Sequence, residues 1–277
     1  MPSSPTSQLI AAVSDRLTRT ERRIAQAVLD EPTLLAFGTV SDLAARVATS
    51  RPSIVRFATK LGFEGYTGLQ NHVRRGLSDQ LSRPIDRIRS EDGGTSRERT
   101  ALLAGIDSVF EAVDHGHFKS FSKQIVGARR VWVVTGESSR AGGYALQSGL
   151  AMIRPGVHLV RGHNVARDLA DAGSGDVAVL FDFFRYRRST LTAAEALATI
   201  GTTLLAITDG PLSPLAALTE HWCALTVPAV GPFDSSVPAV AAAELLVAQV
   251  SRDLKKDARD RIDRTEALWD TTGTFCP

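Results

Sequence analysis

The chain has 277 residues, of which 43% are hydrophobic and 22% charged, so it is a globular protein with room for two domains. Its two cysteines form no CxxC pair and its six histidines no ligand-spaced cluster, so the sequence suggests neither a disulfide framework nor a structural zinc site. The net charge of +2 is uneven, because residues 1–89 carry thirteen Lys and Arg against eight Asp and Glu. A basic excess in one half is typical of a protein that binds nucleic acid with one domain.

The sequence gives no sign of export or of a membrane segment. No run of about 18 apolar residues occurs. The first ten residues, MPSSPTSQLI, lack the basic and apolar regions of a signal peptide. We therefore expect a cytoplasmic protein that is neither secreted nor inserted in a membrane.

The N-terminal part predicts an all-helical domain. Thr18 and Glu21 have the spacing of a capping box at the start of an amphipathic helix. Residues 41–63 then predict two short helices joined by a tight turn, and a further helix is expected over residues 66–81. Apolar residues recur at helical spacing in both short helices, at Leu43, Ala44 and Val47 and at Ile54, Phe57, Ala58 and Leu61.

This pair of helices is interpreted as a helix-turn-helix, the second helix of which reads DNA. Ser50 is expected to be its N-cap and Pro52 lies in its first turn, so that the helix N-terminus faces phosphate. The alternative is an ordinary helical hairpin, but the basic excess of this half favours DNA binding. The residues expected to contact phosphates and base edges in the major groove are Ser50, Arg51, Ser53, Arg56 and Lys60.

A change of composition predicts where the first domain ends. Residues 89–99, RSEDGGTSRER, contain no apolar residue, two adjacent glycines and charges of both signs. Such a segment is typical of a solvated, flexible linker. We therefore expect a DNA-binding domain over residues 1–88, a linker over 89–100 and a second domain over 101–277.

Strands and helices alternate after the linker. Strands are predicted over residues 131–135, 157–160, 177–181, 204–208 and 223–227, and helices over 102–126, 139–153, 191–200, 215–218 and 237–254. Strands joined by helical crossovers predict an α/β fold with a doubly wound parallel sheet. Such sheets bind ligands at the carboxyl ends of their strands.

This order of domains resembles that of the RpiR-type bacterial transcriptional regulators, whose second half is a sugar isomerase (SIS) domain. In the first half the resemblance rests on TVSDLAARVATSRPSIVRFATKLGFEGYTGLQ. In the second half it rests on VVTGESS, DVAVLFDF, AITDGPLSPLAAL and LWDTTGTF. The resemblance implies a homodimer or homotetramer that binds a partly palindromic double-stranded DNA operator, and two half-sites do require at least two recognition helices. It implies no cofactor.

The resemblance also implies a phosphosugar site between two loops. The first loop, residues 136–140, reads GESSR, with Ser138 where the family usually has a second glycine. The second loop, residues 182–190, reads DFFRYRRST where most members carry a Ser-x-Ser-Gly-x-Thr cradle for phosphate. We therefore expect weak binding of ordinary hexose phosphates and tighter binding of another small anionic metabolite through Arg185.

The residues expected to bind this ligand are Ser138, Ser139, Arg185, Arg187, Ser235 and Ser236. Each assignment has a plainer alternative. The arginines equally suit an exposed basic loop or a subunit interface. The two serines at 235 and 236 equally suit the N-terminal cap of the helix that begins at Val237.

Catalysis has little support in the sequence, and no catalytic or metal-binding residue is predicted. Glu137 and Glu244 are candidate isomerase bases, but they are more simply a loop residue and a helix-surface residue. The alternative function is a SIS-domain sugar-phosphate isomerase, since fold alone does not exclude it. A stand-alone isomerase has no use for a basic helix-turn-helix. We therefore predict a transcriptional regulator that senses a small anionic metabolite, a sugar phosphate or another acid.

Overall fold

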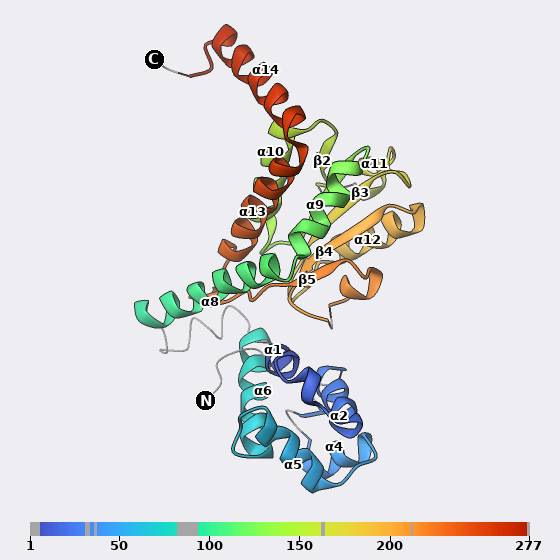
Figure 1. Ribbon diagram of the computed structural model, residues 1–277, viewed down its shortest axis with the longest axis vertical. Coiled ribbons are helices and arrows are strands. Elements are labelled where there is room, and N and C mark those ends of the chain that lie inside the picture. Colours follow the sequence, from blue (N-terminus) through green and yellow to red (C-terminus); the bar gives the residue numbers. More distant parts are fainter. Residues whose placement is uncertain are drawn as a thin grey trace. The chain divides into compact units, whose positions relative to one another are not determined.

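The computed structural model describes residues 6–30, 34–35, 38–81, 94–161, 164–211 and 213–275. The chain divides into two compact units, residues 1–89 and 90–277 (Figure 1). Each unit has its own buried apolar cluster and is described by itself.

The first unit is helical throughout the residues described, as expected. Its elements are α1 (Thr6–Ala11), η1 (Ser14–Arg16), α2 (Arg19–Asp30), α4 (Val40–Arg46), α5 (Arg51–Lys60) and α6 (Tyr66–Leu81). Ile24, Leu43, Ile54, Phe57 and Leu69 are fully buried in one cluster to which α2, α4, α5 and α6 contribute. The apolar spacing of the two short helices therefore gave their inner faces correctly.

Side-chain caps set where two of these helices begin. The Thr18 amide donates to Oε2 of Glu21 at 2.7 Å and the Glu21 amide donates to Oγ1 of Thr18 at 3.3 Å, which confirms the predicted capping box of α2. A second capping box, which the sequence analysis did not identify, joins Thr39 and Asp42 at the start of α4. Both boxes satisfy amides that a helix leaves unpaired at its first turn.

The second unit contains a five-stranded parallel sheet, which confirms the predicted α/β fold. Its strands are β1 (Val131–Thr135), β2 (Val157–Leu159), β3 (Val177–Phe181), β4 (Thr203–Thr208) and β5 (Trp222–Ala224), in the order β2-β1-β3-β4-β5. The strand order reverses between β1 and β3. A crevice at the carboxyl ends of these two strands is the place where doubly wound sheets bind ligands.

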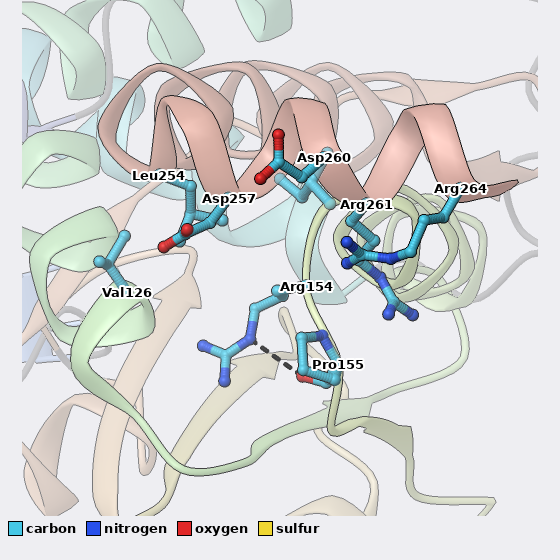
Figure 2. A pocket seen from close by; sticks show the side chains of 9 residues that line it. Val126, Arg154, Pro155, Leu254, Asp257, Asp260, Arg261 and Arg264 are labelled. Carbon is cyan, nitrogen blue, oxygen red and sulfur yellow. Dashed lines mark hydrogen bonds between the residues drawn. The ribbon is translucent and has the colours of Figure 1, made fainter. Parts of the chain in front are cut away.

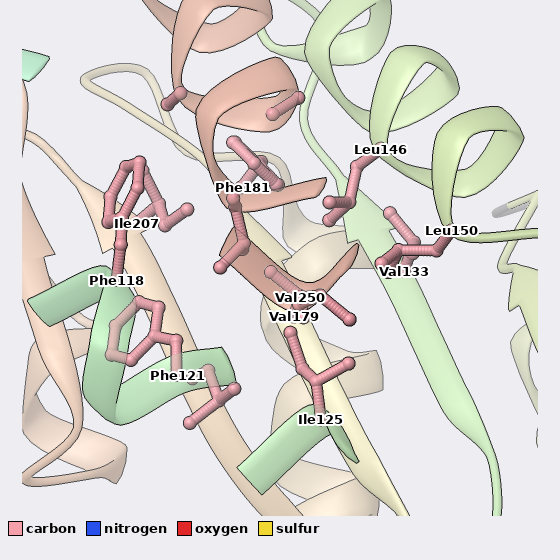
Figure 3. Packing of buried hydrophobic residues seen from close by; sticks show 14 of the residues in the cluster. Phe118, Phe121, Ile125, Val133, Leu146, Leu150, Val179, Phe181, Ile207 and Val250 are labelled. Atoms are coloured by element: carbon pink, nitrogen blue, oxygen red, sulfur yellow. The ribbon is translucent and has the colours of Figure 1, made fainter. Parts of the chain in front are cut away.

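Helices cover both faces of this sheet. The helices of the unit are α8 (Thr95–Asp114), α9 (His117–Gly127), α10 (Arg140–Ile153), α11 (Val165–Asp168), α12 (Arg188–Ile200), η2 (Ala216–Leu218), α13 (Val237–Leu254) and α14 (Lys256–Thr272). Helices α9, α10 and α13 pack over Val133, Val179 and Phe181 on one face (Figure 3). Helix α12 packs over Trp132, Val134 and Leu180 on the other face. Successive strand residues thus alternate between two cores, which is why the strands read as continuous apolar runs.

Several boundaries differ from those predicted. The helix expected over residues 102–126 is two helices, because Gly116 adopts a φ of +78° between α8 and α9. Residues 89–93 of the expected linker lie outside the described residues, and α8 begins at Thr95, so the last part of that segment is helical. The strand expected over residues 223–227 ends at Ala224, and a small hairpin of β6 (Ala229–Val230) and β7 (Phe233–Asp234) follows. Helix α14 was not predicted.

No helix in the described part of the chain is both long enough and apolar enough to cross a membrane.

Candidate DNA-binding and ligand-binding sites

Helix α5 separates an apolar inner face from a polar outer face. Ile54, Phe57 and Ala58 are fully buried, whereas Arg51 and Arg56 are exposed. Within one turn of this outer face, the hydroxyl oxygens of Ser50 and Ser53 lie 2.9 Å apart and Nη2 of Arg56 donates to Oγ of Ser53 at 3.2 Å. Four of the five residues predicted to bind DNA, Ser50, Arg51, Ser53 and Arg56, therefore gather at the N-terminal part of this helix.

Ser50 is the N-cap residue of α5 by backbone conformation, as predicted, and Pro52 lies in the first turn. The hydroxyl of Ser50 does not accept a hydrogen bond from the helix backbone, because it is directed to Ser53. The first amides of the helix are therefore not capped by this side chain. Pro52 has no amide hydrogen and the Ser53 amide donates to the Ser50 carbonyl oxygen at 3.0 Å, so the Arg51 amide is the one in this first turn that is suited to contact a phosphate.

Lys60, the fifth predicted residue, is held by other parts of the first unit. Its Nζ donates to Oε2 of Glu21 at 2.9 Å and to the carbonyl oxygen of Arg16 at 2.6 Å. The same contact, mainly through its hydrogen bond, lowers the pKa of Glu21. The ammonium group therefore fastens the C-terminal end of α5 to the chain around α2, and it is not grouped with Arg51 and Arg56.

Val55 is an outward residue of α5 that the sequence analysis passed over because it is apolar. Its exposed fraction is 40%. It lies one turn after Arg51 and one turn before Thr59, whose Oγ1 donates to the Val55 carbonyl oxygen at 3.1 Å. An apolar group at the centre of a reading helix is suited to contact the methyl group of thymine.

The turn before α5 is fixed by an arginine from α2. Ala48 adopts a φ of +45°, a left-handed conformation that is unfavourable for a residue other than glycine. The Arg23 guanidinium donates to the carbonyl oxygens of Val47 and, at 3.2 Å, of Ala48. This contact joins α2 to the turn that connects α4 and α5.

In the second unit, the loops after β1 and β3 are in close contact at the reversal of strand order. The Gly136 amide donates to the Phe181 carbonyl oxygen at 2.7 Å. A Cβ atom at Gly136 would lie 1.8 Å from Oδ1 of Asp182, so no side chain fits there. The predicted ligand loops are thus neighbours, as the resemblance implied.

The two serines of the first loop have different environments. Ser139 is fully buried, and its Oγ donates to the Phe181 carbonyl oxygen at 2.7 Å. That hydroxyl therefore joins the two loops and is not presented to a ligand, contrary to expectation. Ser138 is partly exposed and remains available.

Glu137 lies between two arginines. Its Oε2 accepts hydrogen bonds from Nη2 of Arg140 at 2.9 Å and from Nη2 of Arg187 at 3.0 Å. Arg185, by contrast, is exposed and forms no hydrogen bond or ion pair with other described residues. It adopts a φ of +70°, in the left-handed region that favours glycine. Of the two arginines predicted to bind a ligand, Arg187 is already paired and Arg185 is not.

Two buried or half-buried carboxylates organise the second loop. Asp182 is 2% exposed and accepts hydrogen bonds from the Phe183 amide at 3.0 Å and the Arg187 amide at 2.9 Å. Burial, with a smaller contribution from the charge of Asp209, raises the pKa of Asp182 to about 6 against the opposing effect of these amides. The sequence showed both aspartates at strand ends but not which amides they accept from.

Asp209 fixes the outer part of the same loop. It accepts hydrogen bonds from the Phe184 amide at 3.0 Å and from the Tyr186 hydroxyl. Burial and the adjacent Asp209 charge raise the pKa of Tyr186 above its ordinary value, so its hydroxyl stays protonated and remains a donor. The loop is therefore held from within at both ends.

Ser235 and Ser236 lie where α13 begins. The Val237 amide donates to Oγ of Ser235 at 3.2 Å, so Ser235 makes the capping contact that was the plainer alternative. Ser236 is the N-cap residue by backbone position, without a side-chain cap. The first turn of α13 meets α10 closely, since a Cβ at Gly142 would lie 2.6 Å from the Ala239 carbonyl oxygen. The pair therefore lies near the start of α10, as the loop after β1 does.

A cavity of about 340 Å³ lies elsewhere in the unit, between the ends of α9 and α10 and the start of α14 (Figure 2). Arg154 and Pro155 line it just before β2, at the amino ends of the strands. The Arg154 guanidinium is buried and donates to the carbonyl oxygens of Ile125, Ala128 at 2.7 Å and Pro155 at 3.2 Å. These bonds close the end of α9, and the loops at the opposite edge of the sheet, where doubly wound sheets bind ligands, remain the candidate ligand site.

No group of three or more His, Cys, Asp or Glu side chains that could hold a metal ion occurs among the residues described.

Comparison with known proteins gives both units a family. A helix-turn-helix domain model of the rpiR family matches residues 6–80, and a SIS domain model matches residues 125–249.

Three similar proteins illustrate the range of relatives. The bifunctional protein glk of Burkholderia orbicola is 25% identical over 132 residues, which are 47% of this chain but only 21% of that protein. An HTH-type transcriptional regulator of Caldanaerobacter subterraneus is 22% identical over 219 residues, 75% of each chain. The solved structure of Vibrio vulnificus NanR complexed with ManNAc-6P aligns with a TM-score of 0.54 and 17% identity, covering 97% of this chain and 99% of that one. The chain thus spans about a fifth of the glk proteins it matches.

Proposed function

Because the chain belongs to the RpiR-type transcriptional regulators, with an N-terminal helix-turn-helix domain and a C-terminal SIS domain, we propose that it binds a DNA operator and senses a small anionic metabolite. The observation that carries the proposal is the pairing of two features in one chain. One is the exposed Arg51, Ser53 and Arg56 face of α5, and the other is the loop pair at the reversal of strand order. We assign DNA binding to residues 1–88 and ligand sensing to residues 101–277, joined by a linker over 89–100.

DNA recognition is assigned to the N-terminal half of α5. Arg51 and Arg56 supply cations for phosphates and for guanine edges, while Ser50 and Ser53 supply hydroxyls of short reach. The ammonium group of Lys60 is bound to Glu21 and to the Arg16 carbonyl oxygen. Lys60 can contact a DNA phosphate only if the phosphate displaces these two partners. The contact with bases is therefore expected to come mainly from Arg56.

Ligand sensing is assigned to the loops after β1 and β3. The NanR structure is described as complexed with ManNAc-6P, which supports a small-metabolite site in the corresponding domain here. The residues that we assign to the ligand are Ser138, Arg185 and Arg187, with Ser236 at the start of α13. A ligand that engages both loops changes the ion pair between Glu137 and Arg187, and that change is available to alter operator binding.

We further propose that the protein acts as a homodimer or homotetramer in the cytoplasm and is not an isomerase. A single recognition helix makes too few contacts for operator-level affinity, so two copies are required. Glu137, a candidate isomerase base, holds two arginines and is poorly placed to abstract a proton from a substrate.

The test begins with the full-length protein and a random library of duplexes. The expected results are a partly palindromic site recovered by selection, a dimer or tetramer by light scattering, and an affinity for that site which a metabolite panel modifies. Conversion of aldose phosphates to ketose phosphates, measured in parallel, should stay at the buffer rate. Failure to select any DNA sequence would refute the regulator, and isomerase turnover would favour the alternative.

A further inference from the structure

The loop after β3 contains a carboxylate of the protein, that of Asp182, where a phosphate-binding loop would bind the anion of a ligand. The carboxylate of Asp182 is buried, lies against Gly136 and accepts hydrogen bonds from the amides of Phe183 and Arg187. Arg187 is the N-cap residue of α12, so its amide lies at the helix end that attracts negative charge. The amides of Phe183 and Arg187, which would otherwise be available to a phosphoryl group, are thus already used by the protein.

The remaining charges of the site are nearly balanced. The loops after β1, β3 and β4, with the first residues of α10 and α12, carry four arginines, Arg140, Arg185, Arg187 and Arg188, and three acids, Glu137, Asp182 and Asp209. Glu137 is within 3.0 Å of two of these arginines. Arg185 and Arg188 are both exposed and have no hydrogen-bond or ion-pair partner among the residues described. One excess positive charge matches a ligand with one negative charge.

From these contacts we propose that Asp182 determines specificity, and that it bars phosphate esters and leaves a site for a metabolite with a single carboxylate bound by Arg185. The proposal rests on the ligand-sensing function assigned above and specifies the class of ligand. A phosphate monoester carries close to two negative charges at neutral pH. Placed at the start of α12 it would meet the negative charge of the Asp182 carboxylate, which already accepts from the amides of Phe183 and Arg187. A carboxylate instead suits the planar fork of one guanidinium.

The decisive experiment replaces the internal anion. Calorimetry with inorganic phosphate is performed on the full-length wild type, on Asp182→Ser and on Asp182→Asn, which keeps the side-chain volume. Both variants lose the negative charge, and each leaves at least one of the two amides without its carboxylate acceptor, so phosphate should bind about tenfold more tightly in both than in the wild type. The matched control is Asp263→Asn, which removes one exposed carboxylate of α14 and should change nothing.

A second measurement uses two sugars that differ only in the anionic group at carbon 6, glucuronate and glucose 6-phosphate. The wild type should favour glucuronate, and Asp182→Ser should shift the ratio of the two affinities towards the phosphate ester by about tenfold. Arg185→Ala should weaken glucuronate binding without improving phosphate binding.

Two outcomes overturn the proposal. One is wild-type binding of phosphate as tight as that of folded Asp182→Asn, and the other is a ratio of affinities that does not move on substitution. Circular dichroism establishes whether each variant is folded. If Asp182→Ser does not fold, the result for Asp182→Asn decides the test. Operator binding is measured separately on the same proteins. Loss of DNA binding alone would refute the proposed regulator while leaving the role of Asp182 intact.

Discussion

Glu137 and Arg187 join the two ligand loops across the reversal of strand order, with 3.0 Å between Oε2 and Nη2. Both side chains are more than half exposed, so the pair adds little to stability, about 0–1 kcal/mol for such contacts. Its effect is on charge, since Glu137 neutralises part of the positive charge that an anionic ligand would meet.

Glu137→Gln should therefore strengthen anion binding. Removal of the carboxylate leaves Arg140 and Arg187 without their anionic partner, and the affinity for glucuronate should rise about threefold to tenfold with little change in stability. Calorimetry and thermal melting of the full-length protein measure the two effects. Glu266→Gln on α14 removes an exposed carboxylate of the same kind and is the control. An unchanged affinity would show that the ligand does not approach these arginines.

Gly136 should not tolerate a methyl group. Its Cβ would lie 1.8 Å from Oδ1 of Asp182, and Gly136→Ala should lower the free energy of unfolding by about 1–3 kcal/mol. Gly210, after β4, has no atom within 4 Å of a built Cβ, so Gly210→Ala should stay within about 0.5 kcal/mol of the wild type. Urea unfolding of both variants gives the comparison. Equal effects would mean that the two loops separate readily.

Arg185 should lower the free energy of unfolding and raise the affinity for the ligand. Because its φ is +70°, Arg185→Gly relieves a left-handed backbone, whereas Arg185→Ala retains it. The glycine variant should be more stable than the alanine variant by about 1 kcal/mol. Both should lose ligand affinity equally, since both lack the guanidinium group. A glycine variant that binds as well as the wild type would remove Arg185 from the ligand site.

The raised pKa of Asp182 predicts a dependence of stability on pH. With a pKa of about 6 in the folded state, against 3.8 unfolded, Asp182 keeps its proton in the folded chain at a pH where the unfolded chain has released it. Its contribution is therefore most favourable below about pH 4 and is lost as the pH rises to about 6, by about 3 kcal/mol in all.

Tryptophan fluorescence suits this measurement, because Trp132, Trp222 and Trp269 all belong to the second unit. The free energy of unfolding of the wild type, relative to that of Asp182→Ser, should decrease as the pH rises from about 4 to about 6, the range that the pKa shift defines. Asp209 and the Arg187 amide face the same carboxylate, and they are present in both proteins. A difference that is independent of pH would contradict the raised pKa.

For DNA recognition, Arg56→Ala should reduce affinity for the selected operator by about 1–3 kcal/mol and relax the preference at one base pair. Arg252→Ala removes an exposed arginine of α13 and is the control for charge alone. Fluorescence anisotropy over a range of salt concentrations separates loss of base contact from loss of phosphate contact. An Arg56→Ala protein with full affinity and preference would exclude Arg56 as a reader.

Periodicity predicted most of the fold because most of its elements bury a face. The runs around Val133, Val179 and Leu205 are strands because both of their faces are covered, and α5 is clear because Ile54 and Phe57 recur at helical spacing. Helix α14 has Ala258 as its buried residue and so lacked a strong apolar pattern. The break at Gly116 was missed because an isolated glycine within a helical pattern is often tolerated.

The site was predicted less fully, because a sequence does not show which polar groups already bond to each other. The Ser139 hydroxyl has the right chemistry for a ligand, yet it is hydrogen-bonded to the Phe181 carbonyl oxygen. The Lys60 ammonium group has the right chemistry for DNA, yet it is bound to Glu21. Asp182 was quoted within its loop but given no role. Its importance depends on the Arg187 amide, five residues along, turning back towards it.

The two edges of the sheet limit how copies of this chain associate. Edge strands β2 and β5 are three residues each, so each exposes only a short row of unpaired amides and carbonyls. Rows this short are poor templates for a strand from another molecule, and short edges are a common protection against aggregation. A second copy therefore gains little by extending the sheet, and we expect the proposed oligomer to form through side chains on the helices. An oligomer of this kind can be changed by single substitutions on a helix surface without disturbing the sheet that holds the ligand loops.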